Sequence, residues 1–522
     1  MKSFKYLIFI LAAAIAATGC YDDKGSYNTG SWTDIVSVEG MTLPGIESMN
    51  RLGLVEDEIF SLNPTVRFRQ GVDESRITYN WILGGDTIAS TLKLDWTVTR
   101  TEKMEFDATN MEAKFWLAIN NTATGESWRY YLRGSGNNLL KITIAQTITP
   151  KIGIFVYEKQ DGTIEWGSVK GSNSAAPAAF TTLYTELYTR YNTSRKMQGS
   201  VAGATFNGGK LLVYTNHAPD YGAMIQTSET GTYALGLFTG TISDEVFQGA
   251  PDGVITDQAH YPGSMQEMLI GNSLFVAPGN EIYQLILPNA TPTQEGVAQI
   301  MGANPFTGKM HFSVQRTTTN ELYYYRYNKN RGYLHQPLPD GNGATLKADK
   351  IIGVCRQPTL IDKQLKMLVA TKSGAAYWLY TYTYEQKTSG NDIITFVSRK
   401  EITSWAGGMS DDCTLFTNAI EVPLNYLYIA KGRDLWRTSY ESQTNPQVAK
   451  SFPAPITAVR IATNVAEPVS DANELYLAVF TYDEGTKTSK MYVLDGKAAD
   501  LKAFSEVETP IPGKVVRYMP YL

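Results

Sequence analysis

Cysteine is scarce in this sequence, with three among 522 residues, and so few thiols cannot form a disulfide scaffold. Clusters of positive charge are also missing, because the 46 lysines and arginines are outnumbered by 51 aspartates and glutamates and nowhere form a run. Nucleic-acid binding needs a clustered basic surface, so we expect no nucleic-acid partner. Beyond the first twenty residues no run of eighteen apolar residues occurs, which excludes a further helical membrane anchor of the usual length there.

Groups that bind metals or act in catalysis are few. The four histidines show no pair at the helical spacing of a metal site, so we expect structural roles for them and neither a metal nor a cofactor. Cys355 and Cys413 could pair in an oxidising compartment or remain isolated buried thiols, and the second interpretation is preferred. The segment Asp340–Gly343 lacks the later ligands of a calcium loop and therefore predicts a turn. The histidines are His217, His260, His311 and His335.

The first nineteen residues have the plan of a signal peptide. Lys2 and Lys5 precede the apolar stretch Leu7–Ala17, and small residues lead into Cys20. The apolar stretch is shorter than the roughly 20 residues that cross a bilayer as a helix, so it does not predict a permanent membrane span. We expect cleavage before Cys20. An ordinary secretory signal in which Cys20 has no special role is the alternative.

The residues around this cysteine carry two resemblances. The segment Ala17–Cys20 resembles the lipobox of bacterial lipoproteins, although that family usually has leucine where Ala17 stands; the resemblance implies lipid attachment at Cys20. Residues 20–31 then form a tether. Its start, Tyr21–Tyr27, resembles the PKD-like surface lipoproteins of Bacteroidota, which implies that Asp22 and Asp23 direct export to the outer face of the outer membrane. A tether that is merely polar and solvated is the alternative.

Composition predicts an all-β protein, because 32 tyrosines and 44 glycines favour strands and tight turns. Residues 32–148 show about seven short strands separated by turn signals, the pattern of an immunoglobulin-like sandwich. Within it, Tyr79–Trp81 resembles the aromatic-x-Trp strand of PKD domains. We expect Trp81 to fill the core, and a ligand-stacking role is the alternative.

Residues 149–522 repeat one unit, a short apolar run, a turn and a second run rich in Tyr or Trp. The units recur roughly every 50 residues, which predicts a β-propeller of about seven blades. Val515–Tyr518 is expected to close the ring beside the first blade, and residues 175–191 to form a surface helix. A chain of further sandwiches is the alternative. The first runs of the units are Ile152–Val156, Leu211–Tyr214, Leu274–Val276, Met310–Val314, Leu365–Ala370, Tyr426–Ile429 and Leu475–Phe480.

Two kinds of side chain are candidates for a site in this repeat region. Glycoside hydrolysis needs two carboxylates about 5 to 10 Å apart, and a ring can bring distant acids together at its centre. Aromatic side chains on strands could instead stack on a sugar or grip a partner protein, or simply fill the space between blades. The acidic candidates are Glu165, Asp257, Glu267, Asp411 and Asp412, and the aromatic candidates for binding are Tyr323, Tyr325, Tyr377 and Trp378.

Two functions follow from this reading. The preferred one is a non-catalytic accessory of nutrient uptake, in which the sandwich is a stalk and the propeller binds a glycan or peptide or docks on an importer. The resemblance to PKD-like lipoproteins implies partnership with a TonB-dependent transporter and its SusD-like lipoprotein. The alternative is a surface-exposed hydrolase of the glycosidase type that acts on the same nutrient. We regard an enzyme as the less favoured class, and no catalytic residue is assigned.

Overall fold

The protein is described here by a computed structural model, and its described part is built almost entirely of β-strands. No helix in this part is long and apolar enough to span a membrane. The chain divides near residue 147 into two compact units. The described residues are 34–43, 51–100, 112–145, 153–170, 182–207, 210–226, 236–247, 254–261, 265–278, 284–285, 297–302, 312–328, 332–356, 364–385, 387, 392–417, 426–461, 476–495, 501 and 503–520.

The first unit is a β-sandwich. Its main sheet has the strand order β3-β12-β9-β6-β7. The strand β10 pairs with β9 on the same side as β12, but further along β9. Smaller pairs, β1 with β5 and β4 with β8, supply further strands. The strands are β1 (Ile35–Glu39), β2 (Thr42–Leu43), β3 (Arg51–Val55), β4 (Ile59–Leu62), β5 (Thr65–Phe68), β6 (Ile77–Leu83), β7 (Asp86–Ala89), β8 (Leu94–Thr97), β9 (Glu112–Asn121), β10 (Ser127–Tyr131), β11 (Arg133–Gly134) and β12 (Lys141–Ala145), with one 3₁₀ turn, Glu74–Arg76.

The core of this unit centres on Trp81, as the sequence predicts. The indole is fully buried and stacks on Phe115 with ring centroids 5.3 Å apart. Its N–H donates to the carbonyl oxygens of Thr91 (3.0 Å) and Leu92 (3.2 Å), so the polar atom of a large apolar side chain is satisfied. Phe60 on β4 meets Phe115 edge to face at 6.2 Å, which shows that the β4–β8 pair covers the inner face of the main sheet.

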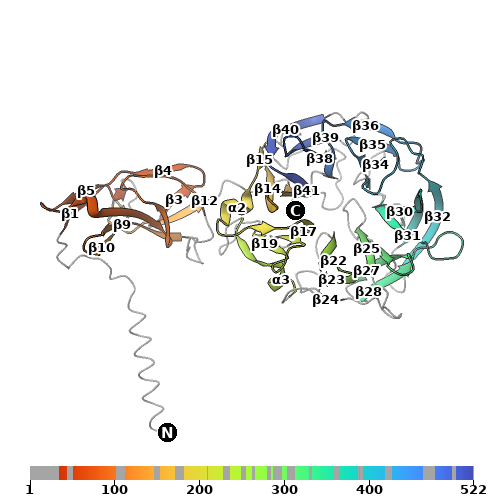
Figure 1. The fold of residues 1–522 in the computed structure, drawn as a ribbon, viewed down its shortest axis with the longest axis horizontal. Coiled ribbons are helices and arrows are strands. Elements are labelled where there is room, and N and C mark those ends of the chain that lie inside the picture. The colour runs from red at the N-terminus through yellow and green to blue at the C-terminus, as the bar shows by residue number, and fades with distance from the viewer. Residues whose placement is uncertain are drawn as a thin grey trace, which may run out of the picture. The chain divides into compact units, whose positions relative to one another are not determined.

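The second unit is a β-propeller. Its described residues form seven sheets arranged around a common centre (Figure 1), and each blade contributes four strands in antiparallel order. The first blade consists of β41 (Lys514–Pro520), β13 (Gly153–Glu158), β14 (Thr163–Lys170) and β15 (Thr182–Tyr184), with the short β16 (Met197–Gln198) beside β14. The second blade consists of β17 (Val201–Asn207), β18 (Lys210–Thr215), β19 (Gly222–Gln226) and β20 (Phe238–Thr241). The third consists of β21 (Ile255–Tyr261), β22 (Met265–Ile270), β23 (Ser273–Pro278) and β24 (Gln284–Leu285).

The remaining four blades follow the same order. They are β25 (Val297–Gly302), β26 (Phe312–Arg316), β27 (Leu322–Asn328), β28 (Gly332–Pro337); β29 (Lys350–Arg356), β30 (Gln364–Ser373), β31 (Ala376–Glu385), β32 (Ile393–Glu401); β33 (Thr414–Thr417), β34 (Tyr426–Lys431), β35 (Asp434–Ser439), β36 (Gln447–Ser451); and β37 (Ile456–Ile461), β38 (Tyr476–Asp483), β39 (Thr488–Asp495), β40 (Ala503–Ile511).

The last strand closes the ring, as predicted for Val515–Tyr518. β41 pairs antiparallel with β13, the first propeller strand along the chain, so that Tyr518 lies opposite Phe155. The ring of Tyr518 packs on Phe480 of the seventh blade at 5.4 Å, which joins the two ends of the propeller through one buried cluster. The first blade therefore depends on both ends of the second unit.

The innermost strands share one irregularity. Six of them shift register by one residue soon after they begin, and this inserts a β-bulge that increases the local twist. The shifts fall between Val515 and Arg517, Val201 and Gly203, Ile255 and Asp257, Val297 and Gln299, Ile351 and Gly353, and Ile456 and Ala458. This recurrence supports a true structural repeat.

Two details differ from the sequence-based expectation. The predicted hairpin at Leu274–Val276 does pair with β24, but these are the third and fourth strands of their blade, and the middle hairpin is β22 with β23. The expected surface helix over 175–191 is wrong in its described part. Thr182–Tyr184 is a strand, and only α2 (Leu187–Tyr191) is helical; it is buried rather than exposed because Leu187, Tyr188 and Tyr191 all face the blade core. Residues 175–181 lie outside the described residues.

Candidate functional site at the junction of the fifth and sixth blades

Of the aromatic side chains proposed for binding, Tyr377 lies in a polar network, and its neighbour Trp378 does not. The two are consecutive on β31, so their side chains point to opposite faces of the blade. Tyr377 packs with the buried residues around Trp405, whereas Trp378 packs with the cluster that contains Tyr324. Arg399 lies 5.4 Å from the Trp378 ring centroid. The two side chains therefore do not share one binding surface.

The other two aromatic candidates belong to the fourth blade. Tyr323 is on β27, is half-buried and donates its hydroxyl hydrogen to Glu321 at 2.8 Å. Tyr325 is two residues further along the same strand, and its side chain lies outside the described residues. The structure thus places Tyr323 and Tyr325 on a strand of one blade and Tyr377 on the next.

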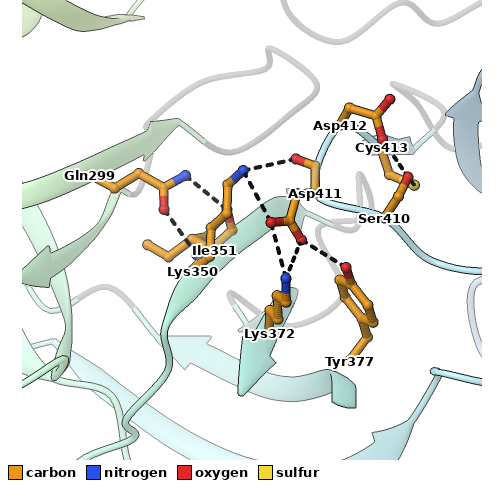
Figure 2. A network of polar contacts seen from close by, with 9 residues as sticks. All are labelled: Gln299, Lys350, Ile351, Lys372, Tyr377, Ser410, Asp411, Asp412 and Cys413. Atoms are coloured by element: carbon orange, nitrogen blue, oxygen red, sulfur yellow. Dashed lines mark hydrogen bonds and ion pairs between the residues drawn. The ribbon is translucent and has the colours of Figure 1, made fainter. Parts of the chain in front are cut away.

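Asp411 is the centre of the network that contains Tyr377 (Figure 2). The Tyr377 hydroxyl donates to Asp411 Oδ1 at 2.7 Å, and Lys372 Nζ lies 3.0 Å from Oδ1 and 3.1 Å from Oδ2. Lys350 Nζ lies 3.9 Å from Oδ2 and donates to the Asp411 backbone carbonyl at 3.1 Å. One exposed carboxylate therefore holds together the starts of β29 and β31 and the end of β30.

These contacts stabilise the ionised form of Asp411. The hydrogen bond from Tyr377, followed by that from Lys372, lowers the pKa of the Asp411 carboxyl. The same contacts with Asp411 raise the pKa of the Tyr377 hydroxyl and that of the Lys372 ammonium. A carboxylate held ionised is a poor proton donor, so this arrangement suits binding and positioning better than general acid catalysis.

The network also fixes the connection from β32 to β33. Tyr377 N donates to Thr403 Oγ1 at 2.9 Å, and Ile402 N donates to the Tyr377 carbonyl at 2.8 Å. Lys431 on β34 donates to the carbonyls of Gly407 (2.5 Å) and Gly408 (3.1 Å). The connection is therefore held from both the fifth and the sixth blade.

A side-chain amide joins the fourth blade to the same region. Gln299 on β25 donates from Nε2 to the Ile351 carbonyl at 2.8 Å, and Ile351 N donates back to Gln299 Oε1 at 2.9 Å (Figure 2). The amide thus pairs with the inner strand β29 as a backbone group would. This contact positions Lys350, which directly precedes Ile351.

Glu165, the first acidic candidate, has a structural role. It is buried on β14 and accepts hydrogen bonds from the backbone N–H groups of Tyr188 (3.0 Å) and Thr189 (3.3 Å) and from the Thr189 hydroxyl. Burial raises the pKa of Glu165, and these hydrogen bonds oppose the rise. The carboxylate therefore satisfies the first turn of α2, where backbone N–H groups have no partner within the helix.

The remaining acidic candidates lie elsewhere. Asp412 accepts a hydrogen bond from Ser410. Asp257 and Glu267 are on the paired strands β21 and β22, where Glu267 lies opposite Ala259, and their side chains lie outside the described residues. Glu165 and Asp411 are engaged by separate partners in different blades, so the described contacts do not assemble them into a pair.

Several other polar residues were expected to have structural roles, and the structure describes some of them. Asp340 accepts from the backbone N–H groups of Asn342 (2.7 Å) and Ala344 (3.1 Å), which is the turn predicted there. Cys355 and Cys413 are free, buried thiols, as predicted, and burial raises the pKa of Cys355. The described residues contain no group of three His, Cys, Asp or Glu side chains that could hold a metal. His217 is exposed, His260 and His335 lie on β21 and β28, and His311 lies outside the described residues.

Comparison with known proteins adds no family. No family model matches the chain, and no curated protein matches it. Among solved structures, the chain is similar to the N-terminal domain of Nup159 (11% identity, 67% of this chain and 94% of that chain, TM-score 0.30) and to the β-propeller domain of Vanderwaltozyma polyspora Nup133 (9%, 63% and 91%, TM-score 0.29). It is also similar to the dihydro-heme d1 dehydrogenase NirN (10%, 81% and 78%, TM-score 0.35). At these values the similarities carry no argument about function.

Sequence reasoning singled out Tyr377 and Asp411 separately and missed that they form one site. The partners of Asp411 are 34 residues away at Tyr377, 39 at Lys372 and 61 at Lys350. No local motif encodes such a grouping. It follows only from the register of the fifth blade, in which Lys372 lies directly opposite Tyr377.

Proposed function

We propose that the protein is a lipid-anchored binding protein of the outer-membrane surface that serves nutrient uptake without catalysis. In this proposal Cys20 carries the lipid, and Asp22 and Asp23 direct export to the outer face. The cargo is a glycan or a peptide, and the partners are a TonB-dependent transporter and its SusD-like lipoprotein. The support for location and partners is the sequence from Ala17 to Tyr27.

The observation that carries the binding role is the Asp411 network. A carboxylate, a tyrosine and two lysines from three strands are fixed in one exposed cluster by the register of the blade and by the connection after β32. Preorganised polar groups on a rigid scaffold lower the cost of ordering on binding. The closure of the ring by β41 provides that rigidity.

The glycosidase alternative receives no comparable support. A general acid needs a raised pKa, and Glu165 has one, but its oxygens accept hydrogen bonds from the first turn of α2 and the side chain is buried. We therefore propose binding rather than hydrolysis.

Affinity purification from solubilised outer membranes tests this function. The tagged, lipidated chain is expected to retain a TonB-dependent transporter, and the transporter's cargo would then identify the nutrient. Cys20→Ala is the matched control, because it removes the lipid while leaving the folded units unchanged. Repeated purification of correctly lipidated protein without any transporter would contradict the proposal.

An Asp411→Asn variant tests the site. It removes the charge at the centre of the network while keeping the shape of the side chain, so loss of cargo binding without loss of transporter retention is expected. Asp95→Asn is a matched control, since Asp95 is an exposed carboxylate paired with Lys93 in the other unit. Unchanged cargo binding by Asp411→Asn would remove the site from the proposal.

A further inference from the structure

The outer face of the main sheet in the first unit carries an aromatic cluster that the stalk role does not use. Side chains on a strand alternate between faces, and on β9 the buried residues Phe115, Leu117 and Ile119 alternate with Trp116 and Ala118, which are half-buried. The first three belong to the hydrophobic core. Trp116 and Ala118 therefore lie on the face that points away from the core.

The register of three strands places nine residues on this face in three rows. β9 is central, with β6 on one side and β10 on the other. The rows cover about 10 Å across the strands and about 14 Å along them, from the usual strand spacing and rise. The rows are Ile82, Trp116 and Tyr131; Asn80, Ala118 and Arg129; and Thr78, Asn120 and Ser127.

Trp116, Tyr131 and Arg129 form the aromatic cluster of this face. The rings of Trp116 and Tyr131 are 5.7 Å apart and tilted by 47°, and both remain partly exposed. The Arg129 guanidinium lies 5.6 Å from the Trp116 ring centroid, in the range of a cation–π contact. Ala118 lies beside Arg129 in the middle row and adds little bulk next to Trp116 on β9.

Around this aromatic cluster the polar side chains mainly offer hydrogen-bond donors. The Asn80 side-chain oxygen accepts from Ser90 at 3.0 Å, and the Asn120 side-chain oxygen accepts from Ser127 at 2.6 Å. Each amide oxygen is thereby engaged, and each amide nitrogen remains a donor. Together with Arg129, these groups suit a ligand that is rich in acceptors.

The charge of the same face is positive. Lys114 is exposed two residues before Trp116 on β9 and lies opposite Lys141, which in turn lies beside Arg51. The acidic residue of these strands, Glu112, is buried and bound by both Arg51 and Lys141. Lys114 and Arg129 thus lie on opposite sides of Trp116 along the direction of β9.

We propose that this face of the first unit binds an acidic glycan, a polysaccharide whose sugar rings carry carboxylates. The sugar rings stack on Trp116 and Tyr131, Asn80 and Asn120 donate to hydroxyl oxygens, and Arg129 with Lys114 pairs with the carboxylates. A flat, extended ligand fits better than a membrane surface, because Trp116 is half-buried within the sheet rather than fully exposed. The inference rests on the proposed surface role for the origin of the ligand and adds a site separate from the propeller.

Affinity electrophoresis and calorimetry on the full mature chain carrying Cys20→Ala test this site. The probe is polygalacturonate, and its methyl-esterified form is the matched ligand that keeps the sugar ring but lacks the charge. We expect binding to polygalacturonate that weakens with esterification and with added salt. Trp116→Ala should weaken binding about tenfold or more and Tyr131→Ala severalfold, the former corresponding to about 1.4 kcal/mol.

Two arginine variants separate specific recognition from net charge. Arg129→Gln should weaken binding about fivefold and reduce its salt dependence. Arg67→Gln removes one charge from the exposed strand β5, outside the three rows, and should change neither. Thermal unfolding of each variant checks that the unit is still folded.

Three results would overturn the proposal. The first is no binding to polygalacturonate, and the second is equal binding of the esterified form. The third is unchanged affinity in both Trp116→Ala and Tyr131→Ala. Binding to anionic vesicles that depends on Trp116, without polysaccharide binding, would assign the face to the membrane instead. A Trp116→Ala chain that loses polygalacturonate but still retains the transporter would show that the two functions are separable.

Discussion

Replacing Trp81 by alanine should destabilise the first unit and leave the propeller unchanged. Trp81 is fully buried, and truncating such a side chain costs about 3–5 kcal/mol. The indole N–H also satisfies the carbonyls of Thr91 and Leu92, and their loss adds to this cost. Domains of this size are stable by only about 5–15 kcal/mol, so the change removes a large share of the unit's stability.

Differential scanning calorimetry of the mature chain measures this effect. For a domain of about 100 residues, 1 kcal/mol shifts the unfolding temperature by roughly 4 °C or more, so we expect a shift of about 12 °C or more in one transition. Trp81→Phe keeps an aromatic ring against Phe115 but loses the N–H donor and part of the ring volume, and should shift the same transition by less than Trp81→Ala does. A Trp81→Ala protein in which both units lose stability equally, or neither does, would refute the reasoning.

Three further predictions concern the propeller. Tyr518→Ala should destabilise it by about 3–5 kcal/mol, because a buried ring at the closure is lost, and chemical denaturation would detect no such change if the ring closes elsewhere. The pKa of Glu165 is raised, so its ionisation opposes folding as the pH rises above the usual carboxyl range. Glu165→Gln should therefore be neutral or stabilising at pH 7, whereas Glu165→Ala should destabilise the propeller because the first turn of α2 loses its hydrogen-bond acceptor. Thermal unfolding at pH 4 and pH 7 measures both effects. Asp411 has a lowered pKa, so protection of residues 402–413 from protease should persist at pH 5 and disappear only as the pH falls through the lowered pKa; loss of protection at pH 5 would argue against the network.

The repeat and its closure could be predicted from sequence because both leave local signals. Alternation of apolar residues between turn residues marks the middle strands of every blade except the third, and Val515–Tyr518 remains as an unpaired strand at the end. The surface helix could not be placed correctly. Burial of Leu187, Tyr188 and Tyr191 depends on Glu165, which is more than twenty residues away and satisfies the N–H groups of the first turn of α2.

The candidate sites were harder to predict than the fold. Strand alternation alone indicates that Tyr377 and Trp378 face opposite ways, but it does not show that Lys372 and Asp411 meet Tyr377. Trp116 and Tyr131 were not singled out, although each directly follows another aromatic residue, Phe115 and Tyr130. They become neighbours only when β10 pairs with β9 in the observed register, and that register depends on the turn after Asn121.

The central claim is that lipid on Cys20 anchors the folded units at the membrane, and mass spectrometry of the amino-terminal peptide of the mature protein tests it most directly. We predict a chain that begins at Cys20 with its sulfur carrying lipid, and a Cys20→Ala protein that is released from the membrane fraction. A mature protein with an unmodified Cys20, or one that keeps residues 1–19, would contradict the account.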